Sequence, residues 1–238
     1  MLQAVSQASP DVIVNCAAWT AVDQCESDPE RSDRINHQAV GFLAAAATHT
    51  EAHLVQVSTD YVFDGTKAGE YIESDETNPR SVYGISKRAG ELAAGPSATV
   101  VRTSWLCSAH GGNMVATILR LADANPELRF VDDQRGKPTF TADLAVALRM
   151  LARDRHAGVV HITNAEAVSW FAFAQQVLIA SGDDPDRVRP VSTEELAINY
   201  PAPRPANSAL SNDHLRSLGY PPLRDYRLAL ADVIGAYR

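Results

Sequence analysis

The feature that most constrains the fold is a series of short apolar runs without polar alternation. Val12-Ile13-Val14 and Leu54-Val55-Gln56-Val57 are rich in β-branched residues and end in polar residues. A parallel strand that is buried on both faces has this pattern, because neither face of the strand meets water. The two runs therefore predict neighbouring strands in the interior of an α/β sheet.

Segments of helical length separate these runs, so that strands and helices alternate along the chain. A strand–helix–strand order with crossovers of 10–20 residues is typical of a doubly wound parallel sheet with right-handed connections. The fold class expected is therefore a Rossmann-like α/β fold. The expected strands are 12–16, 54–58, 98–103, 128–131 and 158–163, and the expected helices are 2–8, 29–48, 82–94, 113–124, 141–153 and 169–181.

A chain of 238 residues can form one sizeable core with a small additional lobe. The pattern becomes more irregular after about residue 165. We therefore expect a main α/β domain over residues 1–165 and a smaller lobe over 166–238 that does not fold by itself.

Composition excludes several classes of function. The net charge of −8 argues against nucleic-acid binding. The sequence has no run of 18 apolar residues and no secretory signal, so no membrane partner is expected. Three scattered cysteines favour a reducing cytoplasm, and no metal-ligand spacing is present, so we assign no metal ligand.

Polar residues stand where three of the expected strands end. These stretches are Asn15–Thr20, Ser58–Asp60 and Arg102–Trp105. Ligands of doubly wound sheets bind beyond the carboxyl ends of the strands. Ala17 and Ala18 are small enough to let a flat ring or a ribose approach the backbone.

Tyr83 and Lys87 lie four residues apart and share one face of the expected helix 82–94. A tyrosine hydroxyl has an ordinary pKa of about 10, and a neighbouring cation lowers it. The pair could then exchange a proton with a carbonyl or alcohol oxygen held by the Thr59 hydroxyl. By itself this spacing is only suggestive, and the preceding Ser58-Thr59 strand end strengthens it.

The arrangement Thr59, Tyr83 and Lys87 resembles the Thr/Ser–Tyr–Lys triad of extended short-chain dehydrogenases/reductases. Longer motifs are similar to those of the dTDP-4-dehydrorhamnose reductases over about residues 10–225. These motifs are VNCAAWTAVD (14–23), STDYVFDG (58–65), YGISKRAGE (83–91), RTSWLC (102–107) and APRPANSAL (202–210).

The resemblance implies a reduction of the 4-keto group of dTDP-4-dehydro-L-rhamnose to dTDP-L-rhamnose by NADPH or NADH. Thr59, Tyr83 and Lys87 would be catalytic, with Tyr83 as the proton donor and Lys87 lowering its pKa and binding the nicotinamide ribose. Other residues would bind the ligands. Ala17, Ala18, Thr20 and Ser58, with Tyr83 and Lys87, would contact the cofactor, and Thr59, Asp60, Trp105, Asn113 and Arg204 would contact the sugar nucleotide.

Two other functions stay open from the sequence. One is a non-catalytic regulatory subunit on the same fold, and the other is a nucleotide-sugar epimerase or dehydratase with the same triad. Retention of all three triad residues disfavours the regulatory subunit. The STDYVFDG and RPANSAL motifs disfavour the epimerase or dehydratase. The sequence does not decide between NADPH and NADH as the cofactor. It also leaves open whether Mg²⁺ is required and whether the chain forms a homodimer.

Reductases of this kind open with a strand, a glycine-rich loop and a helix that bind the cofactor pyrophosphate. The printed sequence has no such loop, and Val12-Ile13-Val14 would form an exposed apolar edge. The sequence therefore predicts an N-terminally truncated form with a complete proton-transfer site.

We expect the 238-residue chain on its own to bind NADPH weakly, to show little activity and to aggregate. The reason is the missing phosphate-binding loop together with the exposed strand edge. Titration of NADPH fluorescence with the purified chain measures the affinity. Tight binding would contradict this expectation.

Overall fold

A four-stranded parallel sheet forms the centre of the computed structural model, which describes residues 1–196 and 201–237. The strand order is β1-β2-β3-β8. The strands are β1 (Val12–Asn15), β2 (His53–Thr59), β3 (Thr99–Thr103) and β8 (Gly158–His161). The parallel sheet and its four strands confirm the predicted α/β class.

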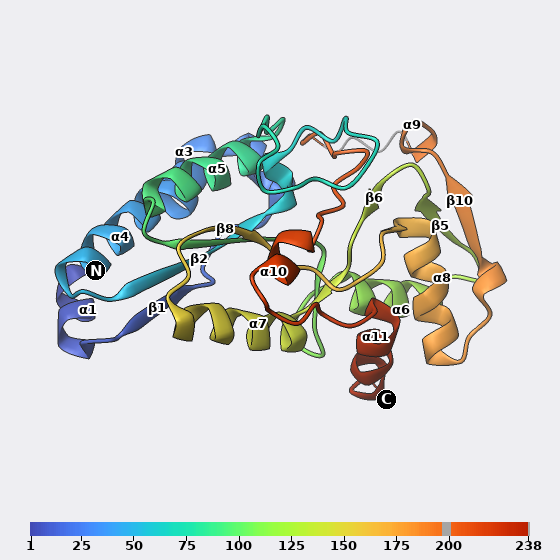
Figure 1. The fold of residues 1–238 in the computed structure, drawn as a ribbon. Coiled ribbons are helices and arrows are strands. Elements are labelled where there is room, and N and C mark those ends of the chain that lie inside the picture. Colours follow the sequence, from blue (N-terminus) through green and yellow to red (C-terminus); the bar gives the residue numbers. More distant parts are fainter. Residues whose placement is uncertain (197–200, 238) are drawn as a thin grey trace.

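Helices cover both faces of this sheet. α4 (Ala39–His49) and α5 (Val82–Ala94) lie on one face and α7 (Thr141–Asp154) on the other (Figure 1). Adjacent residues of β2 point to opposite faces, so Leu54 packs with the α4 and α5 side while Val55 packs with α7. This double burial explains why apolar residues occupy successive positions in β2, as Leu54 and Val55 do.

The helix predicted over 29–48 is divided into three segments. α3 (Pro29–Asp33) begins at the Asp28 cap, a π-helical turn (Arg34–Gln38) follows, and α4 continues the same direction. π turns insert one extra residue and often occur at functional sites. This one buries Asn36 toward α5.

Two glycines let the backbone of α5 pack directly against the backbone of two neighbouring segments. A Cβ at Gly84 would overlap the carbonyl oxygen of Tyr61, and a Cβ at Gly90 would overlap that of Asn36. Larger residues would push α5 away from both segments. The glycines of the YGISKRAGE motif therefore determine how closely α5 packs against the segments that contain Tyr61 and Asn36.

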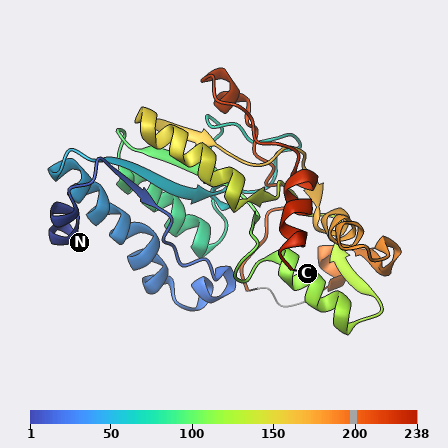
Figure 2. The same ribbon diagram turned by 90° about the horizontal axis from the view of Figure 1, so that it is seen from below.

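A second group of elements lies beside the carboxyl end of the sheet, as Figures 1 and 2 show. It contains α6 (Met114–Ala124), β5 (Leu128–Val131), α8 (Trp170–Ser181), β10 (Val188–Val191) and α11 (Tyr226–Gly235). The strand predicted near 128–131 forms, but it pairs in parallel with β10 outside the main sheet.

The lobe boundary at residue 166 stays a prediction. The core of the second group draws on both sides of that position, since Val115, Ile118 and Phe140 pack with Phe173 and Leu230. Two further pairs of short strands lie outside the main sheet. They are β4 (Leu106–Cys107) with β7 (Thr139–Phe140) and β6 (Arg135–Gly136) with β9 (Val168–Ser169).

Short helices complete the described chain. They are α1 (Leu2–Ala8), α2 (Val22–Ser27), η2 (Asp60–Val62), η3 (Pro185–Arg187), α9 (Thr193–Leu196) and α10 (Asp213–Ser217). Over residues 1–196 and 201–237, no helix is long and apolar enough to cross a membrane. β1 is an edge strand of the sheet, and its Val14 is 44% exposed.

Replacement of Gly90 by Ala should lower the free energy of unfolding by about 1–3 kcal/mol, because the new Cβ meets the Asn36 carbonyl. Gly41→Ala is the matched control. Its Cβ would lie 3.8 Å from that of Ala93, so we expect no loss and a gain of up to about 1 kcal/mol. Urea denaturation measures both, and equal effects would contradict the close approach.

Candidate active site

Thr59, Tyr83 and Lys87 meet at the carboxyl end of β2. Thr59 is the last residue of β2 and pairs in register with Thr103 of β3, while α5 supplies Tyr83 and Lys87 one turn apart. All three side chains are buried, and their relative exposure is 5%, 7% and 4%. The structure thus brings together the three residues that the sequence predicts as catalytic.

The hydroxyl of Tyr83 is held in its neutral form. Burial raises its pKa above the usual value of 10, and a hydrogen bond with Thr59 opposes the rise in part. The ring of Tyr61 packs edge-on against the ring of Tyr83, and the two ring centroids are 5.6 Å apart. The sequence predicts that Lys87 lowers this pKa, but in this structure the pKa of Tyr83 is raised, and burial is the largest cause.

The ammonium of Lys87 is buried with one carbonyl partner. Its Nζ donates a hydrogen bond to the Val57 oxygen at 2.7 Å. Burial lowers its pKa to about 8, and the negative charge of Glu91 opposes this shift. An ammonium has three donors, so two remain for a ligand beside the strand end.

Asp60 follows Thr59 directly and is 2% exposed. Its Oδ1 accepts a hydrogen bond from the Thr59 hydroxyl at 3.0 Å. Burial raises the pKa of its carboxyl to about 6, against hydrogen bonds from Ser208 and Thr59. Asp60 therefore lies in the same cluster as Thr59 and Tyr83.

The loop that contains Ala17, Ala18 and Thr20 follows β1 beside α5. Ala17 and Thr20 are exposed, and Ala18 is half-buried. Asn36 holds the loop, since it accepts from the Trp19 N–H at 2.8 Å and donates to the Trp19 oxygen at 3.1 Å.

Asn36 also connects this loop to the helix that carries Tyr83 and Lys87. Its amide donates to the Ser86 hydroxyl at 3.0 Å. Sequence reasoning missed Asn36, because a single polar residue in a helical segment carries no distinctive pattern. Its role depends on three segments that are distant in the chain.

Ser58 makes a different contact from the predicted one. Its hydroxyl donates to Glu91 Oε1 at 2.6 Å inside the interface between β2 and α5. The hydroxyl is therefore engaged in the protein interior, and the prediction that Ser58 binds the cofactor stays a prediction.

The partner of Ser58 belongs to a buried ion pair. Both carboxylate oxygens of Glu91 accept from the Arg102 guanidinium at 2.9 Å, and Arg88 adds a bond at 3.2 Å. Glu91 and Arg102 are almost fully buried. A bidentate pair of this kind fixes α5 against β3.

Trp105 lies after β3 with a left-handed backbone angle, φ 46°. Its ring stacks on Trp170 with a centroid distance of 3.5 Å and an interplanar angle of 7°. A bulky residue in this conformation is strained, so surrounding contacts must hold it. Its predicted contact with the sugar stays a prediction.

Asn113 caps a helix in this structure. Its Oδ1 accepts from the N–H groups of Val115 and Ala116 at the start of α6. Its Nδ2 donates to Ser108 and Tyr237. Both ends of the amide are thus engaged within the protein, and its predicted contact with the substrate stays a prediction.

Arg204 pairs with Asp23 of α2 at 2.6 Å. It lines a cavity of about 290 Å³ together with Tyr61 and the exposed Arg80, a residue that sequence reasoning did not select. The chain around Arg204 is held by Gly65, which has φ 83° and where a Cβ would lie 2.6 Å from Pro205. The STDYVFDG and RPANSAL motifs therefore pack against each other.

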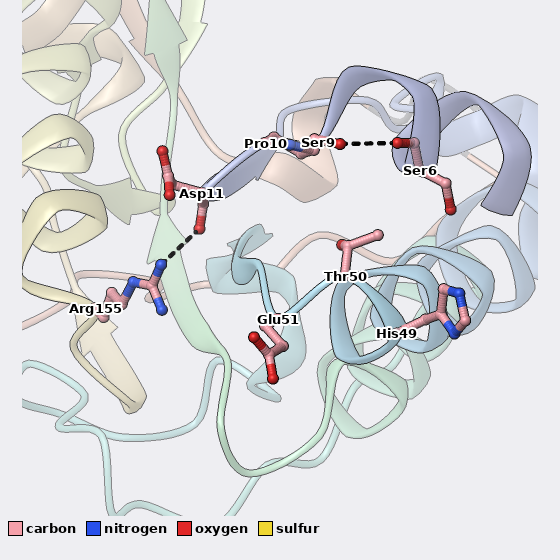
Figure 3. Close-up of a pocket in the computed structure, with 8 residues that line it drawn as sticks. All are labelled: Ser6, Ser9, Pro10, Asp11, His49, Thr50, Glu51 and Arg155. Carbon is pink, nitrogen blue, oxygen red and sulfur yellow. Dashed lines mark hydrogen bonds between the residues drawn. The ribbon is translucent and has the colours of Figure 1, made fainter.

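A larger cavity, of about 440 Å³, lies at the opposite end of the sheet (Figure 3). Its lining includes Asp11 and Glu51, which precede β1 and β2. Arg155 points toward the Asp11 backbone oxygen, to which it donates at 3.3 Å. This cavity is remote from the strand ends that carry Thr59 and Thr103, so it is not part of the candidate site.

The described ranges contain no group of three or more His, Cys, Asp or Glu side chains that could hold a metal ion. We therefore assign no ligand set for Mg²⁺.

Comparison with known proteins gives the family. The protein-family model described as RmlD substrate binding domain matches residues 1–238 of the chain. The chain belongs to this RmlD family. The dTDP-4-dehydrorhamnose reductase of Streptomyces griseus is 43% identical to this chain over 238 residues, covering 96% of this chain and 78% of its own length.

Two further relatives bear on the site of this RmlD family chain. A Streptomyces antibioticus protein named probable dTDP-4,6-dihydroxy-2-methyloxan-3-one 4-ketoreductase is 44% identical, covering 96% of this chain and 79% of its own length. The crystal structure of Bacillus anthracis dTDP-4-dehydrorhamnose reductase in complex with NADP has a TM-score of 0.93 and 35% identity. It covers 98% of this chain and 83% of that one, and the Rossmann-like fold is thereby established.

Replacement of Arg102 by Met should lower the free energy of unfolding by about 3–5 kcal/mol, because it leaves a buried Glu91 charge without its main partner. Arg88→Met is the matched control at the same carboxylate. The Arg88 side chain is 30% exposed, so we expect a loss below about 1 kcal/mol. Denaturant titration at neutral pH compares them, and losses of similar size would refute the structural weight given to Arg102.

Proposed function

We propose that this chain catalyses the NADPH-dependent reduction of the 4-keto group of dTDP-4-dehydro-L-rhamnose, which gives dTDP-L-rhamnose. The main observation in support is the buried cluster of Thr59, Tyr83 and Lys87 at the carboxyl end of β2. The names of the relatives support the substrate, and the bound NADP of the B. anthracis structure supports the cofactor.

Tyr83 would donate the proton. Its raised pKa keeps the phenol neutral at physiological pH, and the neutral form is the one a reduction requires. NADPH, when bound, supplies the hydride to the carbonyl carbon. The alkoxide that results is a much stronger base than a phenolate, so it takes the Tyr83 proton. The Thr59 hydroxyl would orient the same oxygen.

The residues around Lys87 suit a nicotinamide ribose. Two of its donors have no described partner, and hydroxyl groups are good acceptors for a buried ammonium. The exposed backbone at Ala17 leaves room for a flat group beside β1. We assign Ala17, Ala18, Thr20, Tyr83 and Lys87 to the cofactor, and we leave out the Ser58 hydroxyl.

The sugar nucleotide would lie between the strand ends and the second group of elements. Asp60 and Trp105 are proposed to contact the deoxysugar, and Arg204 the diphosphate through charge-assisted hydrogen bonds. Arg80 lines the same cavity as Arg204 and adds a second positive charge. Asn113 is left out, because its amide caps α6.

A second substrate has specific support. The S. antibioticus relative is named as a ketoreductase of a different dTDP-linked keto sugar, at a similar identity. The chemistry proposed for Tyr83 is the same for both substrates. A cytoplasmic location and a homodimer stay predictions from the sequence.

Replacement of Tyr83 by Phe should lower kcat by about 10²–10⁴-fold, because it removes the proton donor and leaves the ring in place. The assay follows NADPH absorbance with dTDP-4-dehydrorhamnose, and in parallel with the second keto sugar. Tyr226→Phe is the control, since Tyr226 is buried in the core beside Phe173, away from the site. Because weak NADPH binding is expected, the assay is run at saturating NADPH, and turnover of neither sugar by the unmodified chain under that condition would sink the proposed function.

A further inference from the structure

The carboxyl group of Asp60 has an incomplete set of hydrogen bonds. Among the described residues, its Oδ2 and the Thr103 hydroxyl are the buried side-chain oxygens without a partner. The recorded ion pairs of the described chain include none to Asp60. Hydrogen bonds from Thr59, Ser208 and nearby backbone satisfy this carboxyl only in part, and no described cation pairs with it. A buried carboxylate in this situation is costly, and protonation lowers that cost.

The Thr59 hydroxyl is limited by having a single proton. In this structure that proton is donated to Asp60 Oδ1 at 3.0 Å. The Thr59 oxygen accepts from the Tyr61 N–H at 3.2 Å and is in hydrogen-bond contact with Tyr83. While Asp60 is ionised, Thr59 therefore has no donor left for a ligand oxygen.

We propose that Asp60 is a positioning residue that acts through Thr59. In its protonated form Asp60 donates to the Thr59 oxygen, and this turns the Thr59 proton toward the oxygen bound at Tyr83. In its ionised form Asp60 keeps that proton for itself. This inference rests on the proposed reduction, and it assigns to Asp60 a role beyond contact with the sugar.

The surroundings allow both forms of Asp60 near neutral pH. Burial raises its pKa to about 6. The charges of Arg204 and Asp23 near Tyr61 are paired with each other at 2.6 Å and largely cancel. The ionisable groups that face this cluster are Tyr61 on η2, Tyr83 on α5, Asp23 and Cys25 on α2, and Arg204 on the loop after α9.

The direction of the pH effect follows from the protonation state of Asp60 that activity requires. The active form needs neutral Asp60, so kcat is highest below the pKa of Asp60 and falls as the pH rises through it. The fall should approach about tenfold for each pH unit above that value.

Asp60→Asn tests the switch, because the amide keeps the size of the side chain and always carries a donor. The kcat for reduction is measured from about pH 5 to 7.5, below the range where Lys87 loses its proton. We expect the fall in kcat for the wild type and for Thr59→Ser, and a flat profile for Asp60→Asn. Asp123→Asn, an exposed aspartate on α6, is the matched control and should follow the wild type.

Each remaining outcome decides the proposal. A wild-type pH profile in Asp60→Asn overturns it, and so does a variant in which only KM changes, because that result assigns Asp60 to substrate contact alone. If the wild type reduces no keto sugar, the proposed function fails. The infrared carbonyl band of a protonated carboxyl then decides the inference separately. A band near pH 5 that Asp60→Asn lacks supports it, and no such band in the wild type overturns it.

Discussion

The buried ion pair between Glu91 and Arg102 is the interaction on which the geometry of the site depends. Glu91 lies on α5 and Arg102 on β3, and Ser58 of β2 completes the carboxylate shell. Burial of two charges is costly, so an ion pair of this kind tolerates little change in distance. α5 is thus fixed relative to β2 and β3, and with it Tyr83 relative to Thr59.

Removal of water from the strand end sets the protonation of the site. Burial raises the pKa of Tyr83 and of Asp60, and it lowers that of Lys87 to about 8. All three shifts favour the neutral form of the group. Tyr83 and Asp60 therefore keep protons that they can donate, as a reduction requires, whereas Lys87 loses its proton more readily than a lysine in water. The switch proposed for Thr59 uses the same effect, because only a buried carboxyl would be protonated near neutral pH.

Much of the fold and part of the site could be predicted because their signals are local. Continuous β-branched runs indicated the strands, and the spacing of four residues placed Tyr83 and Lys87 on one face of α5. The direction of side chains that depend on distant partners could not be predicted. Ser58 turns to Glu91, and Asn36 lies in a π turn where it joins the Trp19 loop to α5.

By itself, the sequence determined the α/β class, the strand end at Thr59 and the reactive spacing of Tyr83 and Lys87. It also carried the motifs that resemble those of the dTDP-4-dehydrorhamnose reductases. Only the tertiary structure decided which polar atoms remain available for chemistry, as Asp60 Oδ2 and the Thr59 proton illustrate. The physical reason is that availability depends on burial and on hydrogen-bond partners, and segments far apart in the chain supply both.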